Sequence, residues 1–266
     1  MMKIKYIAVD VDGTLLDDHD HYDEQRLVKD ITALQQRGIT FVIASGNSLD
    51  ALLTMFKGKV NNFVAENGGR IFVNGQETSD YPHQRPVLKE LLRFIGTIPT
   101  PDLLSVSGAS QTYIADQYVK VPVPFYPHHA YFHQLADVTE PIYNFNVSWF
   151  KQRPRLEKIN SIVRKINRAF PQVNATYSGA FGIDILPAGV NKAAGLEKFV
   201  KQTGGSLQEV AAFGDTSNDI EMVRAAGCGI AMKNATPDLL AVADQVTAFD
   251  NNHAGLLEAI EYLFHL

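Results

Sequence analysis

Residues 4–16 read Ile-Lys-Tyr-Ile-Ala-Val-Asp-Val-Asp-Gly-Thr-Leu-Leu, and this stretch decides the fold. The run at 4–9 is largely apolar, which is typical of a buried β-strand. Asp10 and Asp12 follow it directly, and Gly13 lets the chain turn sharply after them. The pair either points both carboxylates toward one reactive site or serves only to form a turn.

Strands and helices alternate in the first and last thirds of the chain. An amphipathic stretch at 23–37, closed by Gly38, predicts a helix, and the apolar run at 39–44 predicts the next strand. This alternation predicts βαβ units, and hence a doubly wound parallel sheet of the α/β class. The other predicted elements are helices at 48–57, 192–202, 218–225 and 255–263, a short helix after Pro237, strands at 63–65, 210–213 and 229–232, and a hairpin formed by 70–73 with Asn74-Gly75.

The middle of the chain differs from the two ends in proline content and in hydrophobic pattern. Residues 83–186 carry most of the prolines, short alternating strands such as 143–150, and two helical patterns at 87–94 and 155–169. This texture predicts an α+β insert rather than more doubly wound sheet. We therefore expect a discontinuous core at 1–82 and 187–266, with 83–186 inserted as a second domain.

Composition narrows the possible partners. Among 266 residues, 24 Lys and Arg stand against 29 Asp and Glu, which gives a net charge of −5 and no electrostatic footprint for nucleic acid or anionic membrane. The single cysteine, Cys228, excludes an intramolecular disulfide framework and a Cys-based zinc cluster. No signal peptide and no apolar run of about 18 residues is evident, so we expect a cytoplasmic protein that binds small molecules. The oligomeric state stays open.

Polar clusters follow several of the predicted strands, where open parallel sheets place their ligands. Ser45-Gly46-Asn47 follows the strand at 39–44 and opens a helix. A hydroxyl, an unobstructed glycine amide and a helix N-terminus together suit an anion. The alternative is ordinary helix capping by Ser45, Asn47 or Ser48.

A second cluster, Gly-Asp-Thr-Ser-Asn-Asp at 214–219, follows the strand at 210–213. Asp215 and Asp219 lie four positions apart, so both carboxylates can approach one cation if a helix begins between them. Together with Asp10 and Asp12 they would repel strongly unless a divalent cation lay among them. Ligation by oxygen alone, without His or Cys, suits Mg²⁺.

Lys192 stands at the start of a predicted helix, where a cation opposes the helix dipole. It is either a solvated surface lysine or a residue that binds an anion held at the same sheet edge. In the second case Lys192, the Ser45 hydroxyl and the Gly46 amide would neutralise a phosphate group.

These clusters resemble, in order, the four motifs of the haloacid dehalogenase superfamily, and in particular its phosphatases. The segments 65–69 (Ala-Glu-Asn-Gly-Gly) and 226–235 (Ala-Gly-Cys-Gly-Ile-Ala-Met-Lys-Asn-Ala), with the mid-chain insert, look like the Cof-type subfamily, subclass IIB. Ser-Gly-Asn at 45–47 and Ser-Gly-Ala-Phe-Gly-Ile-Asp at 178–184 look closest to the bacterial sugar phosphatases. The resemblance covers essentially the whole chain.

The resemblance implies a role for each matching residue. Asp10 would be the nucleophile that forms an aspartyl-phosphate, and Asp12 would be the general acid and base. Mg²⁺ would bind the Asp10 carboxylate, the Asp12 backbone carbonyl and Asp215, supported by Asn218 and Asp219.

Ser45, Gly46 and Lys192 would hold the phosphoryl group. Many Cof-type members carry arginine where this chain has Asn47. This chain therefore lacks a guanidinium group that could bind an anion through two charged hydrogen bonds at that position.

The insert would select the organic part of the substrate. The glycine-rich segment 178–182 would face the catalytic carboxylates, and Asp184 could accept hydrogen bonds from sugar hydroxyls. Alternatively, the glycines mark only a turn between two strands. His129 and His133 have the i, i+4 spacing of a metal site, but a solvated helix face is the preferred interpretation because no acidic third ligand is specified.

The sequence therefore predicts a Mg²⁺-dependent phosphatase that hydrolyses phosphomonoesters of small metabolites, with sugar phosphates as the expected class. Two alternatives stay open. A phosphomutase or phosphotransferase would use the same aspartyl-phosphate. A non-catalytic phosphometabolite-binding protein would need no acid/base group such as Asp12.

Overall fold

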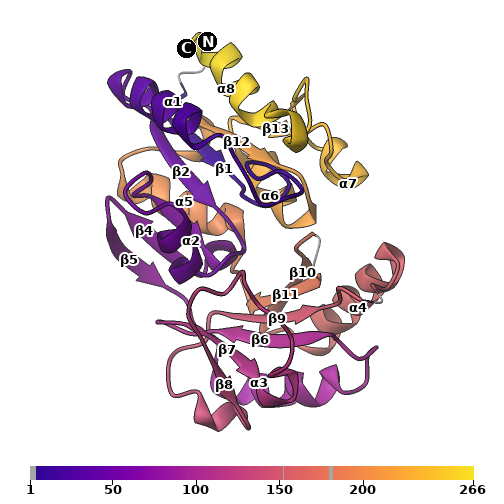
Figure 1. The fold of residues 1–266 in the computed structure, drawn as a ribbon. Helices are drawn as coiled ribbons and strands as arrows, with labels where there is room; N and C mark the ends of the chain where they lie inside the picture. The colour runs from indigo at the N-terminus through magenta and orange to yellow at the C-terminus, as the bar shows by residue number, and fades with distance from the viewer. Residues whose placement is uncertain (1–3, 152, 180–181) are drawn as a thin grey trace.

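The computed structural model describes residues 4–151, 153–179 and 182–266, which form two β-sheets with helices packed on them (Figure 1). The larger sheet has eight strands and the smaller has six. Figure 1 shows the smaller sheet beyond one end of the larger one. The predicted α/β core with a second α+β unit is confirmed.

The larger sheet is parallel except at one edge. Its strands, in order across the sheet, are β14 (Gln245–Val246), β13 (Cys228–Ala231), β12 (Val210–Gly214), β1 (Tyr6–Val9), β2 (Thr40–Ala44), β3 (Phe63–Ala65), β4 (Arg70–Val73) and β5 (Gln76–Asp80). Only the pairings of β4 with β3 and with β5 are antiparallel. The chain builds outward from β1 through β2 and β3, then returns to pair β12 on the other side of β1. This reversal of strand order is where open sheets bind ligands.

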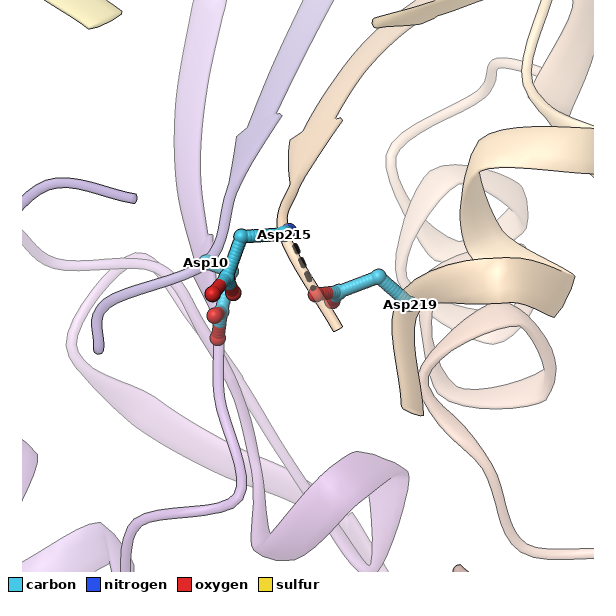
Figure 2. Close-up of side chains that lie close together, drawn as sticks. All are labelled: Asp10, Asp215 and Asp219. Carbon is cyan, nitrogen blue, oxygen red and sulfur yellow. Dashed lines mark hydrogen bonds between the residues drawn. The ribbon is translucent and has the colours of Figure 1, made fainter. Parts of the chain in front are cut away.

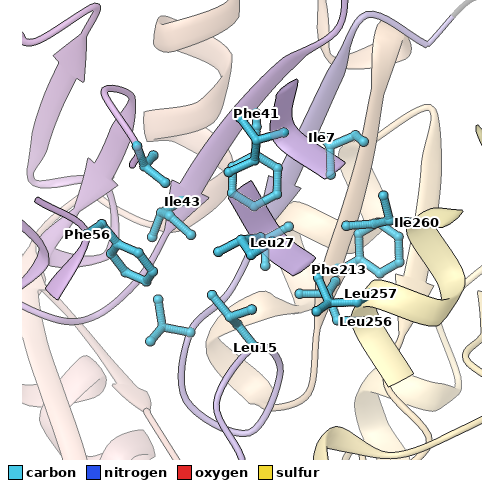
Figure 3. Packing of buried hydrophobic residues seen from close by; sticks show 14 of the residues in the cluster. Ile7, Leu15, Leu27, Phe41, Ile43, Phe56, Phe213, Leu256, Leu257 and Ile260 are labelled. Carbon is cyan, nitrogen blue, oxygen red and sulfur yellow. The ribbon is translucent and has the colours of Figure 1, made fainter. Parts of the chain in front are cut away.

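Both faces of the larger sheet are buried under helices. Alternate side chains of β1 point to opposite faces, so Ile7 and Val9 join one hydrophobic cluster while Ala8 joins another. Figure 3 shows the first cluster, in which Leu27 of α1 (Glu24–Gln36) and Leu257 of α8 (Gly255–Phe264) cover the sheet. The other face packs against α5 (Lys192–Gln202) and α6 (Ile220–Ala225). Burial on both sides explains the nearly continuous apolar runs of the sequence.

The smaller sheet forms the second unit, called the cap below. Its strands, in order, are β10 (Val173–Tyr177), β11 (Gly182–Pro187), β9 (Asn144–Ser148), β6 (Leu103–Ser107), β7 (Thr112–Ala115) and β8 (His129–Phe132). One face packs against α3 (Arg85–Ile95) and α4 (Leu156–Ala169), and Trp149 lies in this core with 1% of its surface exposed. Each fully buried Val, Leu, Ile or Phe side chain of this core stabilises the fold by roughly 1.5–3 kcal/mol relative to its exposed state.

Most predicted elements are present, with small differences. The hairpin of β4 and β5 turns at Asn74-Gly75, whose φ angles of 49° and 84° are those of a tight hairpin turn. The predicted helix at 218–225 begins as a 3₁₀ turn, η5 (Ser217–Asp219), before α6. The remaining helices are α2 (Leu49–Met55) and α7 (Pro237–Leu240).

The prediction of a helix face for His129 and His133 is wrong. His129 begins β8, which pairs in parallel with β7, so the two imidazoles do not share a helix face. His133 instead pairs with Asp116, with its Nδ1 2.7 Å from the carboxylate oxygen. Backbone pairing with β7 outweighed a side-chain spacing that is compatible with either structure.

The predicted domain boundaries, 82/83 and 186/187, stay predictions. The first lies between β5 and α3, and the second lies within β11, one residue before its end. Of the segment 178–182, residues 180 and 181 lie outside the described part of the chain, and β10 and β11 on either side pair antiparallel. None of the helices in the described part of the chain is long and apolar enough to cross a lipid bilayer.

Candidate active site

The carboxyl ends of three adjacent strands place the predicted catalytic residues together. Asp10 follows β1, Ser45 follows β2, and Asp215 follows β12. One carboxylate oxygen from each of Asp10, Asp215 and Asp219 lies within 4.8 Å of the others. Figure 2 shows the Asp10 and Asp215 carboxylates directed at the same space, with Asp219 reaching in from the start of α6.

Lys192 lies inside this cluster and is completely buried. Its Nζ donates to Asp10 Oδ1 at 2.6 Å and to Asp219 Oδ1 at 2.7 Å. Burial alone would lower the pKa of this ammonium group, but the two carboxylates outweigh it and raise the pKa. The interpretation of Lys192 as a solvated surface lysine is therefore wrong.

Lys192 does not fully neutralise the negative charge of the Asp10, Asp215 and Asp219 carboxylates. Burial, followed by the charge of Asp219, raises the pKa of Asp10 to about 7, although Lys192 opposes the shift. Burial, followed by the charges of Asp10 and Asp219, raises the pKa of Asp215 to about 9. One ammonium group thus leaves three buried carboxylates incompletely neutralised, which is the electrostatic setting of a cation site.

The hydrogen bonds show which oxygens remain for a cation. Asp219 Oδ2 accepts from the backbone N–H of Asp215 at 3.0 Å (Figure 2) and of Thr216 at 3.3 Å, and its Oδ1 accepts from Lys192. Asp215 Oδ1, by contrast, is buried without a hydrogen-bond partner among the described residues. A buried, unpaired carboxylate oxygen is costly unless a ligand satisfies it, so the donor set fits a hard cation such as Mg²⁺.

Two glycines make room for this arrangement. Gly13 has a φ of 77°, and a Cβ atom built on it would lie 2.3 Å from Asp215 Oδ2. A Cβ atom on Gly214 would lie 2.4 Å from Asp219 Cγ. Any side chain at either position would displace a carboxylate of the cluster.

The Ser45-Gly46-Asn47 loop precedes α2 but does not provide its N-cap. Ser48 accepts a hydrogen bond from the Ala51 N–H and is the N-cap of α2, so Ser45 and Asn47 are not needed for capping. Ser45 is fully buried, and its Oγ accepts from the Asn47 N–H at 3.1 Å. The Ser45 hydroxyl proton is left to donate elsewhere.

Asn47 contacts Asp12 directly. Its Nδ2 donates to Asp12 Oδ2 at 2.7 Å. The Asp12 side chain is accessible to solvent and does not join the three-aspartate cluster. Even so, the surrounding protein raises the pKa of Asp12 by desolvation, which the hydrogen bond from Asn47 and the charge of Lys192 oppose.

Asn67 is a site residue that the sequence did not single out. It lies in the 3₁₀ turn η1 (Glu66–Gly68) at the end of β3, and 1% of its surface is exposed. Its side chain connects Asp184 of the cap with Asn218 of η5. The signal that could have found it is its position, because β3 is a parallel strand whose carboxyl end borders the same edge.

The face of the cap sheet opposite α3 and α4 is polar. Asp184 is registered with Asn146 of β9, and Asn146 with Ser105 of β6, so these side chains share one face. Asn144, one row further along β9, is 3% exposed, and its Oδ1 has no hydrogen-bond partner among the described residues. Tyr126 lies with this row, because its hydroxyl oxygen is 2.9 Å from Ser105 Oγ.

A polar cavity of about 160 Å³ opens beside Lys192 and Asn218 and reaches β10 of the cap. Its other lining residues are Asn67, Asn167, Asn174, Ala175, Thr176, Leu186, Asn191 and Glu221. Asparagines dominate the lining, so the space beside the buried lysine offers both donors and acceptors.

Comparison with known proteins gives a consistent family. The model of the haloacid dehalogenase-like hydrolases matches residues 7–260. A 5-amino-6-(5-phospho-D-ribitylamino)uracil phosphatase of Escherichia coli, YbjI, is 32% identical, and the alignment covers 98% of this chain and 96% of that protein.

Two solved structures share the fold. The crystal structure of SMU.1108c from Streptococcus mutans has a TM-score of 0.89 at 28% identity, covering 99% of this chain and 100% of that one. A HAD/COF-like hydrolase from Plasmodium vivax has a TM-score of 0.83 at 17% identity, covering 99% and 96%. With the motifs gathered at one sheet edge beside an inserted α+β cap, this chain belongs to the haloacid dehalogenase-like hydrolases and is a phosphatase of small phosphorylated metabolites.

Proposed function

We propose that this phosphatase hydrolyses phosphate monoesters of sugars or polyols, with Asp10 as the nucleophile and Mg²⁺ as the metal ion. The observation that carries the substrate class is the polar face of the cap sheet, including the unpartnered Asn144 Oδ1. Amide and hydroxyl groups in a row suit a leaving group that carries several hydroxyls. The name of YbjI, whose substrate contains a phosphorylated ribityl chain, supports the same class.

The chemistry starts at Asp10. A carboxylate oxygen of Asp10 forms a bond to phosphorus as the bond from phosphorus to the substrate alkoxide breaks. Lys192, the Ser45 hydroxyl and the Gly46 amide stabilise the charge on the transferring phosphoryl group. The hydrogen bond from Lys192 to Asp10 Oδ1 leaves the other carboxylate oxygen for the attack.

Asp12 would move the protons in both half-reactions. Its raised pKa favours the protonated form, which gives its proton to the departing alkoxide. The resulting carboxylate then takes a proton from the water that attacks phosphorus, so inorganic phosphate leaves and Asp10 is regenerated. We propose that Asn47 holds the Asp12 carboxylate for these transfers and need not contact the phosphate itself.

The family implies a divalent metal ion, and the carboxylates present fit one. We propose that Asp10 and Asp215 would hold Mg²⁺ with the Asp12 carbonyl, while Asp219 and Asn218 support them. The ion would supply charge neutralisation for the phosphoryl oxygens and keep Asp10 ionised. Direct contact between Asp184 and substrate hydroxyls stays a prediction.

A phosphate-release assay tests the proposal. The wild-type enzyme with Mg²⁺ should release inorganic phosphate from ribitol 5-phosphate or glucose 6-phosphate faster than from nucleoside monophosphates. Asp10→Asn should lower turnover at least about 10³-fold, because the amide is a poor nucleophile. Asp23→Asn is a matched control, since Asn replaces Asp well at the N-cap of α1.

Two results would contradict the proposal. Substantial turnover by Asp10→Asn would reject the covalent intermediate. A preference for nucleotides or for phosphates without hydroxyls would reject the sugar and polyol class while leaving the phosphatase chemistry intact.

A further inference from the structure

Three polar side chains form a continuous chain of hydrogen bonds between the cap and the core. Asn67 Nδ2 donates to Asp184 Oδ2 at 2.7 Å, and Asn67 Oδ1 accepts from Asn218 Nδ2 at 2.9 Å. All three residues are buried, with 1%, 3% and 7% of their surfaces exposed for Asn67, Asp184 and Asn218. This series of hydrogen bonds therefore extends from β11 of the cap, through the turn at the end of β3, to η5 beside the carboxylate cluster.

The chemistry of its neighbours fixes the orientation of the Asn67 amide. Asp184 acts only as an acceptor here, because its Oδ1 accepts from Asn146 Nδ2 at 2.6 Å. At the other end, Asn218 Oδ1 accepts from the Thr216 hydroxyl, so its Nδ2 is the group that faces Asn67. Asn67 must donate on one side and accept on the other, which an amide does and a carboxylate cannot.

The backbone at Asn67 is held in an uncommon conformation. Glu66 and Asn67 have φ angles of 52° and 51°, in the left-handed region, which costs free energy for a residue such as glutamate. The Asn67 N–H donates to the Ser45 carbonyl at 2.9 Å, and the Glu66 N–H donates to the Asn47 carbonyl at 3.1 Å. The turn is therefore fastened to the loop that would bind phosphate.

Gly46 lies directly against the link between the two domains. A Cβ atom built on Gly46 would lie 2.9 Å from both Asn67 Nδ2 and Asp184 Oδ2. The cap carboxylate and the Asn67 amide that donates to it thus both lie within contact distance of the loop that would bind phosphate.

We propose that Asn67 is a positioning residue that latches Asp184 of the cap onto the core and so sets the position of the polar cap face over the phosphate site. The consequence for substrates rests on the proposed function, whereas the latch itself does not. Both carboxylate oxygens of Asp184 accept hydrogen bonds in this latch, one from Asn67 and the other from Asn146.

An exchange of the two side chains tests the latch. Asn67→Asp places two carboxylates face to face, and Asp184→Asn places an NH₂ group against a donor of either Asn67 or Asn146. The double variant Asn67→Asp/Asp184→Asn restores the pairing between positions 67 and 184 with reversed polarity, because Asn at 184 donates to Asp at 67 and still accepts from Asn146. Asp at 67 still accepts from Asn218.

Kinetics should separate positioning from general damage. Each single variant should raise the KM for ribitol 5-phosphate or glucose 6-phosphate at least about tenfold, a change of about 1.4 kcal/mol. The KM for p-nitrophenyl phosphate, which has no hydroxyls for the cap face to hold, should change less than threefold, about 0.7 kcal/mol by the same conversion. The double variant should return to within about threefold of wild type.

The control is Asn167→Asp, the same substitution at a cap residue whose side chain bonds the Ala175 backbone and not Asp184. Its effect should add to that of Asp184→Asn, without rescue. Small-angle X-ray scattering of the metal-free proteins gives a readout that needs no activity: both single latch variants should show a larger radius of gyration, and the exchanged double variant should not.

Additive effects of Asn67→Asp and Asp184→Asn in the scattering cycle would overturn the latch. If the single variants do not fold, the same cycle with Asn67→Ala and Asp184→Ala decides, and additivity there would again overturn it. A wild-type enzyme without activity on any phosphomonoester would instead reject the proposed function, and the scattering cycle would still test the latch.

Discussion

At the scale of single residues, the hydrogen bond from Asn47 to Asp12 distinguishes two roles for Asn47. The sequence suggested that Asn47 lies among the groups that bind substrate, whereas its Nδ2 lies 2.7 Å from Asp12 Oδ2. A hydrogen bond to a charged group contributes about 1.5–3 kcal/mol, so it is strong enough to fix the carboxylate in one orientation.

Asn47→Leu should therefore lower kcat about tenfold or more and change KM less than about twofold, because the Asp12 carboxylate loses its orienting donor. Steady-state kinetics on the preferred phosphomonoester measure both parameters. Asp12→Asn provides the reference for complete loss of the acid and base. A raised KM with unchanged kcat would show instead that Asn47 binds substrate.

Residue types predicted some contacts and not others. Asp10, Ser45 and Asp215 could be placed together because strand ends of a parallel sheet share an edge, whereas Lys192 begins α5 and was placed with them through the resemblance to the phosphatase motifs. The role of Asn67 could not, since it depends on left-handed φ angles at Glu66 and Asn67. Asparagine tolerates that region, but glutamate gives no signal for it.

At the scale of elements, α1 carries a buried carboxylate that nothing in the described structure satisfies. Asp30 is 1% exposed, and neither of its oxygens has a hydrogen-bond partner among the described residues. Burial, followed by the charge of Glu261, raises the pKa of Asp30 from 3.8 to about 6, against the effect of Arg26. This acid binds a proton more readily in the folded chain than in the unfolded chain.

The sign of the pH dependence follows. The stabilisation from protonated Asp30 is fully present below pH 4 and is lost as the pH rises through about 6. Asp30→Asn should thus raise the free energy of unfolding by about 1–3 kcal/mol at pH 7.5, and by much less at pH 4. Urea unfolding at both pH values measures the difference.

Asp23→Asn, at the N-cap of the same helix, is the control and should show no such pH-dependent gain. An equal gain from Asp30→Asn at both pH values would contradict the explanation by burial of charge.

Elements with a clear local sequence signal were predicted well, whereas a strand that forms only by pairing with another strand was not. The amphipathic pattern of α4 and the Asn74-Gly75 turn are local signals, and both elements form as predicted. β8 depends on β7 for its backbone hydrogen bonds. The i, i+4 spacing of His129 and His133 therefore suggested a helix where the structure has a strand.

At the scale of the whole molecule, the core and the cap have separate hydrophobic clusters. A metal ion bound at Asp10 and Asp215 would touch only the core. At a concentration of 100 times its dissociation constant, such an ion stabilises the state that binds it by about 2.7 kcal/mol. The protein has one tryptophan, Trp149, which lies in the cap core and reports on the cap alone.

Mg²⁺ should therefore raise the midpoint of thermal unfolding followed by circular dichroism by about 5–10 °C, and the midpoint followed by Trp149 fluorescence by less. Asp215→Asn should abolish the shift and serves as the control. Equal shifts in both signals would contradict separate unfolding and show one cooperative unit.

The arrangement of two units could be anticipated from sequence texture, because proline-rich α+β segments differ from alternating strands and helices. How the units meet could not. The contact between Asn67 and Asp184 joins residues 117 positions apart, and no local pattern encodes such a pairing.

The buried ammonium of Lys192 has a further consequence for how the protein survives when its metal supply fails. It bridges Asp10 and Asp219 at 2.6 and 2.7 Å, so one positive charge stays covalently tethered among the acids. A freely exchanging ion can be stripped by a chelator, but this one cannot diffuse away. Starvation for metal should accordingly silence the enzyme without dismantling it, leaving a folded reserve that regains activity as soon as ions return.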